Sequence, residues 1–258
     1  MARGMKKIRL AFEELYYKYW AKNMDIMLLK GAGENDVKAA KTALAGRAFV
    51  NAKSADRQTA LMIAAAKGNR EIVSLLLEKG AAVELKDPNG ETALMKAASG
   101  SYNIEVVNLL LAKGADVNAK DANGVTVLMK SAMNACNREM LKTLLEKGAD
   151  IAAKDNSGNT VLMLAAMYFS NAGVLEVLIE KGADMNAVNQ YGETVIFIGV
   201  RNRLPAVVKV LIGKGFDVNG KNSRGETPLS VTKKNMEKNP QWKVIKDILE
   251  KAGAKEGT

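Results

Sequence analysis

The phrase Thr-(Ala/Val/Pro)-Leu-Met, or a close variant of it, recurs six times along the chain. The threonines that open it are Thr59, Thr92, Thr126, Thr160, Thr194 and Thr227, at spacings of 33, 34, 34, 34 and 33 residues. A fixed period of this length is typical of an array of small units that each contact only their neighbours. The sequence therefore predicts a continuous stack with a ribbon-shaped core, in which any function is spread over a surface.

Composition excludes several classes of protein. Apolar residues make up 48% of the 258-residue chain, which is ample for a core and too high for disorder. No stretch approaches 18 uncharged apolar residues, so we expect no membrane-spanning helix. The chain has no histidine, which removes the commonest general base and the commonest metal ligand. Its single cysteine, Cys136, cannot form an internal disulfide and is interpreted as an incidental, semi-buried thiol.

The net charge of +10 is concentrated toward the two ends of the chain, while the central repeats are balanced. A nucleic-acid-binding protein is expected to line its reading surface with positive charge. The neutral centre therefore argues against that function. We interpret the excess charge as solvated end caps that oppose aggregation.

Each unit follows one plan, which residues 54–86 illustrate. A polar tip precedes Thr59, a suitable N-cap for a short, alanine-rich inner helix over 60–66. Gly68 ends this helix. Apolar residues at spacings of three and four then predict an outer helix with a buried stripe, and Gly80 supplies its left-handed C-terminal residue.

This order of tip, Thr-x-Leu, two helices and Lys-Gly-Ala-Asp-Val-Asn resembles the ankyrin repeat, most closely at Thr92–Ala98 and Leu110–Lys120. The methionine-rich style is also similar to bacterial ankyrin-like proteins. The resemblance implies an all-α ankyrin-type solenoid of six full repeats, with β-turn fingers and a helical N-terminal cap. We expect one domain, divided into an N-terminal helix with a degenerate capping repeat (1–53), five repeats (54–86, 87–120, 121–154, 155–188 and 189–221) and a C-terminal capping repeat with its tail (222–258).

One departure from the family concerns the histidine that usually follows Thr-Pro-Leu. Here that place is taken by Met62, Met95, Met129, Met163, Phe197 and Ser230. We interpret these residues as adaptable packing along the seam between repeats. The alternative is an exposed strip of methionines.

The two ends differ from the central repeats. Lys246 and Glu250 make the last helix polar where its outer face has no neighbour, and Pro240 is expected to begin that helix. At the other end, Lys6–Asn23 predicts an aromatic-rich helix that caps the stack, with a docking or membrane-surface role as the alternative. Charges interrupt Ile8–Trp20, so no signal peptide is expected. The alternatives for residues 1–4 are a native start and a cloning remnant before Met5. We expect a cytoplasmic protein, or an exported one if a leader was removed.

Motifs for catalysis and for cofactors are absent. No Cys or His cluster can hold zinc, and no Gly-x-x-x-x-Gly-Lys-Ser/Thr loop is present for phosphate. Acidic tip residues are scattered one per repeat rather than gathered into a calcium loop. We therefore expect no enzymatic activity and no cofactor or metal.

Recognition of another molecule at a surface is the function that these exclusions leave. In ankyrin-like stacks the tips and inner helices form one concave strip, where we predict an aromatic, methionine and arginine cluster at Met133, Met167, Tyr168, Phe169, Tyr191 and Arg201. The alternative for this cluster is local packing under an inserted residue. Further predicted contacts are Asn134, Leu164, Glu193, Asn89, Glu91, Asn123, Lys96 and Lys130. The expected function is non-enzymatic binding of another protein by a monomer. Alternatives are a nucleic-acid or nucleotide-binding ankyrin stack, and a regulatory or immunity-type inhibitory subunit of an enzyme on another chain.

Overall fold

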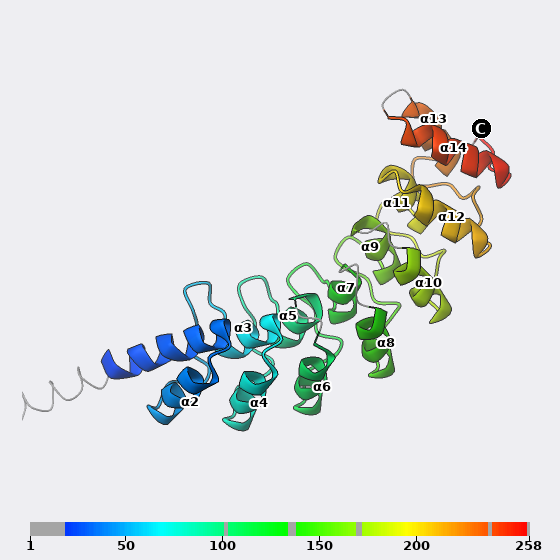
Figure 1. Ribbon diagram of the computed structural model, residues 1–258. Coiled ribbons are helices and arrows are strands. Elements are labelled where there is room, and N and C mark those ends of the chain that lie inside the picture. The colour runs from blue at the N-terminus through cyan, green and yellow to red at the C-terminus, as the bar shows by residue number, and fades with distance from the viewer. Residues whose placement is uncertain (1–18, 101–102, 134–137, 169–171, 237–238, 257–258) are drawn as a thin grey trace, which may run out of the picture. The chain divides into compact units, whose positions relative to one another are not determined.

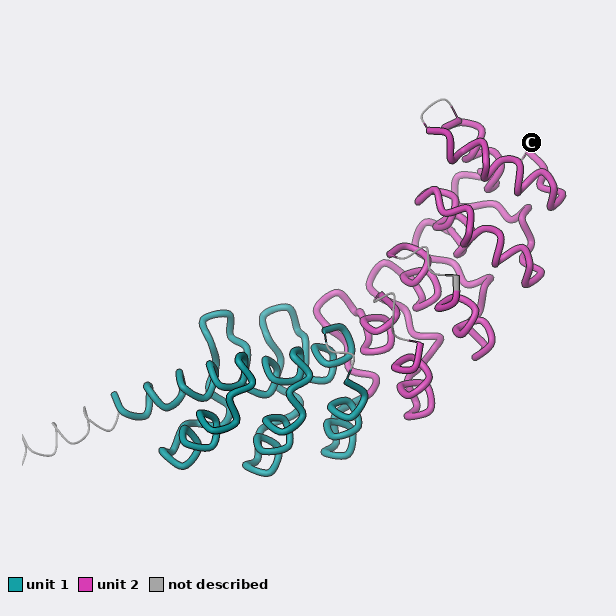
Figure 2. The backbone as a smooth tube through the Cα atoms, viewed as in Figure 1, with its two compact units in different colours: residues 1–116 teal, residues 117–258 magenta. Residues whose placement is uncertain are grey.

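The computed structural model describes the chain except residues 1–18, 101–102, 134–137, 169–171, 237–238 and 257–258. The chain divides into two compact units, residues 1–116 and 117–258 (Figure 2). Both consist of short helices joined by turns. Strand-like pairing within the described residues is limited to isolated bridges inside the fingers, such as Lys120 with Thr126.

In the first unit a helix over residues 19–34 precedes two rows of shorter helices. These are α2 (Val37–Ala45), α3 (Ala60–Lys67), α4 (Arg70–Glu78), α5 (Ala93–Gly100) and α6 (Ile104–Ala112). Inner helices α3 and α5 pack on each other, and outer helices α2, α4 and α6 pack in turn. Figure 1 shows the finger loops of this unit on the side away from the outer helices.

The second unit repeats the arrangement with four helix pairs. They are α7 (Val127–Ala132) and α8 (Arg138–Glu146), α9 (Val161–Tyr168) and α10 (Ala172–Glu180), α11 (Val195–Arg201) and α12 (Pro205–Gly213), and α13 (Pro228–Lys234) and α14 (Gln241–Lys251). The inner helices α7, α9, α11 and α13 pack in sequence, as do the outer helices α8, α10, α12 and α14. The predicted all-α solenoid is thus confirmed.

The core lies between the two rows of helices. Inner helix α3 is alanine-rich because it is packed on several sides, and most of its residues are buried. Outer helix α4 buries one stripe, Ile72, Val73, Leu76 and Leu77, while Glu71 and Glu78 face water. Each fully buried Leu or Ile stabilises the fold by about 2 kcal/mol. Much of that burial comes from the neighbouring repeat, so the repeats stabilise one another.

Threonine begins the inner helices, and in two repeats the methionine three residues later completes the cap. The Thr59 hydroxyl accepts a hydrogen bond from the Met62 amide at 3.3 Å, and the Met62 thioether accepts one from the Thr59 amide at 3.4 Å. Thr126 and Met129 repeat both contacts. Packing of this position inside the seam is confirmed, since its occupants are buried in five of the six repeats: Met62, Met95, Met129, Met163 and Phe197. The sixth occupant, Ser230, is half-buried.

The N-terminal helix differs from the prediction in its extent. The sequence suggested a helix ending at Asn23 and a separate degenerate repeat after it, but the described helix runs without a break from 19 to 34. No proline interrupts this stretch, and Leu28 and Ala32 are fully buried. Helix 19–34 therefore continues past the predicted end at Asn23 and contributes Leu28 and Ala32 to the core. The other predicted aromatic residues, Phe12, Tyr16 and Tyr17, lie outside the described residues.

The C-terminal helix closes the second unit as the sequence suggested. Trp242, Ile245 and Leu249 of α14 are buried against the preceding repeat. On its outer side Lys246 and Glu250 form an i,i+4 ion pair of 3.4 Å. This helix begins at Gln241, and Pro240 is its N-cap. Among the described residues, no helix has the length and hydrophobicity needed to cross a membrane.

Candidate binding surface of the fingers and inner helices

An aspartate or asparagine side chain closes five of the fingers. Asp87 Oδ1 accepts hydrogen bonds from the amides of Asn89 and Glu91, both at 2.9 Å. The equivalent residues Asp121, Asp155, Asn189 and Asn222 make the same two bonds in their own fingers. Such side-chain bonds to the local backbone fix a turn. These residues are not among the predicted contacts, although their recurrence five positions before each threonine is visible in the sequence.

The second carboxylate oxygen of two of these aspartates binds a lysine of the following inner helix. Asp87 Oδ2 lies 2.8 Å from Lys96 Nζ, and Asp121 Oδ2 lies 2.9 Å from Lys130 Nζ. Lys96 also forms an ion pair with Glu91. The lysine side chains are only 15% and 17% exposed, and the aspartates 2%. Lys96 and Lys130, predicted to contact a partner, thus hold the fingers against the helices of their own repeats.

The Asp87–Lys96 pair shifts the pKa of both groups. Burial acts to raise the pKa of Asp87, but the hydrogen bond and charge of Lys96 and the two amide bonds outweigh it and lower that pKa. Burial acts to lower the pKa of Lys96, but its bonds to Asp87 and Glu91 raise it. Both groups are therefore ionised at neutral pH, and neither charge is available to a partner.

Backbone hydrogen bonds join successive fingers in the second unit. The amides of Asn156, Gln190 and Ser223 donate to the carbonyls of Asn123, Ser157 and Tyr191 at 2.9, 3.0 and 3.1 Å. The fingers approach closely at Gly158, where φ is +77° and an added Cβ would lie 3.0 Å from the Gln190 amide nitrogen. These bonds fix the positions of the tip side chains, Asn123 and Tyr191 among them.

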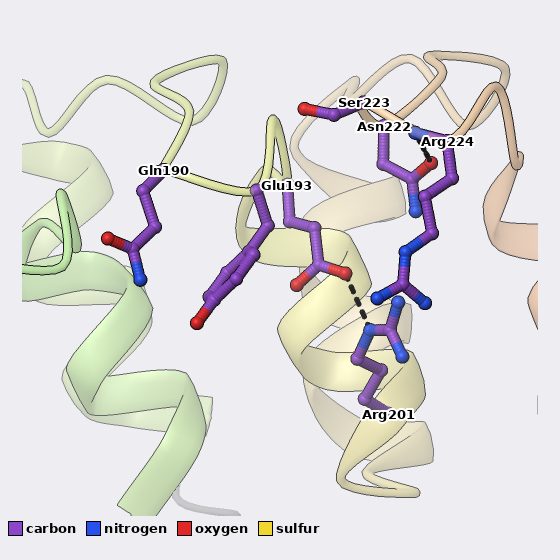
Figure 3. A pocket seen from close by; sticks show the side chains of 7 residues that line it. Gln190, Glu193, Arg201, Asn222, Ser223 and Arg224 are labelled. Atoms are coloured by element: carbon purple, nitrogen blue, oxygen red, sulfur yellow. Dashed lines mark hydrogen bonds and ion pairs between the residues drawn. The ribbon is translucent and has the colours of Figure 1, made fainter.

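A pocket of about 450 Å³ opens between the last two fingers of the second unit (Figure 3). Its lining residues are Gln190, Tyr191, Glu193, Arg201, Asn222, Ser223 and Arg224. Arg201, at the end of α11, places Nε 2.6 Å from Glu193 Oε1 and Nη2 3.8 Å from Glu226 Oε2. Glu193 is buried, whereas Tyr191 and Arg224 are exposed. The pocket therefore joins an aromatic ring with paired charges.

The structure separates the predicted contact residues into accessible and covered ones. Tyr168 and Tyr191 are 53% and 58% exposed, Arg201, Asn89 and Asn123 are exposed, and Met133 and Met167 are half-buried. The predicted residues Tyr191, Glu193 and Arg201 are brought together in the pocket. Leu164, in contrast, is buried with 5% of its surface accessible. Asn134 and Phe169 lie outside the described residues.

The acidic side chains of the described part of this surface do not gather into a metal site. The described residues contain no group of three or more His, Cys, Asp or Glu side chains that could hold a metal ion. The acidic residues of the fingers are instead used in turn closure and ion pairs, as at Asp87 and Glu193.

Paired helices, threonine-capped inner helices and hydrogen-bonded fingers together define a helical repeat protein. Comparison with known families agrees with that class: a family model described as ankyrin repeats, in three copies, matches residues 28–121 and 101–189. The chain belongs to the ankyrin-repeat family, whose repeats are generally protein–protein interaction modules and typically have no enzymatic activity. A search of curated proteins found no match.

Proposed function

We propose that this protein is a non-enzymatic binding module that holds a protein partner on its finger tips and inner helices. The single observation that carries the proposal is the pair of exposed tyrosines, Tyr168 and Tyr191, on the elements that form this surface in the second unit. Exposed aromatic side chains of this kind supply a large share of binding energy at protein interfaces, about 2 kcal/mol or more each.

The rigidity of the fingers supports the same function. Hydrogen bonds within each finger and between successive fingers hold the backbone of Tyr191 in place before a partner arrives. A surface that is ordered in advance avoids part of the entropy loss of binding. Half-buried Met133 and Met167 lie at the ends of successive inner helices and add adaptable apolar surface.

The test begins with affinity capture from the source organism, followed by dissociation constants for the purified partner. Tyr168→Ala is expected to weaken binding at least about tenfold, which corresponds to about 1.4 kcal/mol. The thermal unfolding profile should stay unchanged, since half of this side chain is already in water. Val244→Ala, an exposed apolar position on outer helix α14, is the matched control and should leave affinity unchanged.

Two results would count against the proposal. One is a large loss of stability in Tyr168→Ala with unaltered affinity per folded molecule, which would assign the tyrosine to packing. The other is capture of nucleic acid rather than protein, recognised by an affinity that falls steeply with salt concentration.

A further inference from the structure

Basic side chains recur at matching positions of the last two repeats in the second unit. Arg201 and Lys234 are both seven residues after the repeat threonine, at the ends of α11 and α13. In α7 and α9 the same position carries Met133 and Met167. Because these four helices pack in sequence, the inner wall of this unit changes from methionine to basic residues along its length.

The carboxylates near the pocket already have internal partners. Glu193 binds Arg201 Nε at 2.6 Å. Glu226 accepts a hydrogen bond from Asn222 Nδ2 at 3.1 Å and lies 3.6 Å from Lys234 Nζ. The Asn222 hydrogen bond, with the charges of Lys234, Arg201 and Arg224, lowers the pKa of Glu226 despite the opposing effect of burial. Two carboxylates thus face three cations, which leaves the group with one excess positive charge.

Arg224 supplies that excess. It is exposed at the tip of the last finger, and its guanidinium group forms no ion pair with the described part of the chain. Figure 3 shows its side chain extending across the pocket toward the guanidinium of Arg201. Like charges that face each other repel, and an anion between them would relieve the repulsion. Each guanidinium has five N–H donors, of which Arg201 uses Nε for Glu193.

We propose that this pocket binds the carboxylate of an aspartate or glutamate side chain of the protein partner, held between Arg201 and Arg224. The inference rests on the proposed function and specifies the chemistry of the partner. Planar guanidinium groups suit a carboxylate because its two oxygens can accept parallel hydrogen bonds. Tyr191, at the edge of the pocket, can cover the apolar stem of the bound side chain.

The charge balance favours a carboxylate over a phosphate. One carboxylate neutralises the single excess charge, whereas a phosphate monoester, with a charge near −2, would add repulsion against Glu193 and Glu226. A nucleic-acid backbone would need a track of free cations. In the two preceding repeats of this unit, the position equivalent to Arg201 carries a methionine, and Lys130 is already paired with Asp121. The matching partner segment is one with apolar residues followed by an acidic residue.

The test uses a fluorescein-labelled hexaglutamate peptide as the probe, with its binding followed by fluorescence anisotropy at low salt. Arg224→Gln should weaken binding about fivefold or more, because it removes a charged hydrogen-bond donor without breaking an internal ion pair. Arg201→Gln should weaken it as well, but it also leaves Glu193 buried without its cation. Arg224→Gln is therefore the deciding variant. Lys209→Gln, an exposed lysine on α12, is the matched control and should stay within twofold of the unmodified protein.

Equal affinities for the Arg224→Gln and Lys209→Gln proteins would overturn the inference. Tighter, Arg224-dependent binding of hexathymidylate than of hexaglutamate would also overturn it, in favour of a nucleic-acid ligand. Failure here is distinguishable from failure of the proposed function, because Tyr168 is outside the residues that line this pocket. A captured partner that depends on Tyr168 but not on Arg224 leaves the proposed function intact and removes this inference.

Discussion

The contribution of the Asp87–Lys96 ion pair to stability can be tested with substitutions that copy another repeat of the same chain. In the repeat with Asn189, the residue at the position of Lys96 is Ile198, which is buried, and Asn189 closes its finger as Asp87 does. Lys96→Ile alone leaves the Asp87 carboxylate buried without its cation. Asp87→Asn together with Lys96→Ile copies the Asn189 and Ile198 pair, although Glu91, which pairs with Lys96, also loses that cation.

The structure sets the expected magnitudes. Removing one partner of a buried ion pair destabilises a protein by about 3–5 kcal/mol. Asp87 keeps its two amide bonds at 2.9 Å, and Lys96 is 15% exposed, so we expect the lower value of about 2 kcal/mol for Lys96→Ile. The double variant should recover about 1 kcal/mol or more of this loss, because it removes the buried Asp87 carboxylate, whereas Glu91 still loses its ion pair with Lys96.

Urea unfolding followed by circular dichroism gives the overall effect. Exchange of the Asn89 and Glu91 amide hydrogens gives the local one, because both amides donate to Asp87. A loss of 2 kcal/mol corresponds to about thirtyfold faster exchange. The reasoning is refuted if Lys96→Ile alone is as stable as the unmodified protein, or if the double variant is no more stable than the single one.

Three further outcomes are expected. The unmodified protein should lose its advantage in free energy of unfolding over the double variant as pH falls below 3.8, the ordinary Asp pKa. The pKa of Asp87 is lowered in the folded protein, so the stabilisation from its ion pair disappears when the carboxylate is protonated. Urea unfolding from pH 7 to 2 measures the difference between the two proteins, and a difference that stays constant contradicts the prediction. Gly182→Ala should lower the free energy of unfolding by about 1 kcal/mol for its positive φ alone. Gly158→Ala should lower it clearly more, because the added Cβ meets the next finger. Equal losses for the two variants in denaturant unfolding would disprove that contact. Thr59→Ala should cost about 1 kcal/mol through loss of the helix cap, measured in the same way, and no change would discount the Met62 contact.

Much of the fold could be read from the sequence because its signals are local. A threonine that caps a helix and a glycine at positive φ, such as Thr59 and Gly80, act within a few residues. Their recurrence at 33 or 34 residues then identifies the repeat, since each repeat must present the same faces to its neighbours. The helix predicted to end at Asn23 continues to residue 34, since no proline interrupts it and Leu28 and Ala32 are buried.

The candidate site was less predictable, because it depends on how each finger folds back on its helix. In the sequence, Lys96 and Lys130 resemble ordinary surface lysines. Each lies nine residues after the aspartate with which it forms an ion pair. Leu164 occupies the same register as these lysines, where the side chain lies at the base of a finger, and an apolar residue there is covered. Tyr168 and Tyr191, predicted as partner contacts, are exposed at positions that other repeats fill with small or polar residues, and their contact with a partner stays a prediction.

The sequence by itself determined the kind of architecture, since periodic caps, turns and apolar stripes specify where helices begin, end and bury their faces. The tertiary structure decided which charges remain available to a partner. Lys96 and Lys130 are neutralised by buried aspartates, whereas Arg224 is exposed and extends toward Arg201 across a pocket. That difference depends on distances of a few ångströms between a finger and a helix, and such distances arise only when the repeats fold and stack.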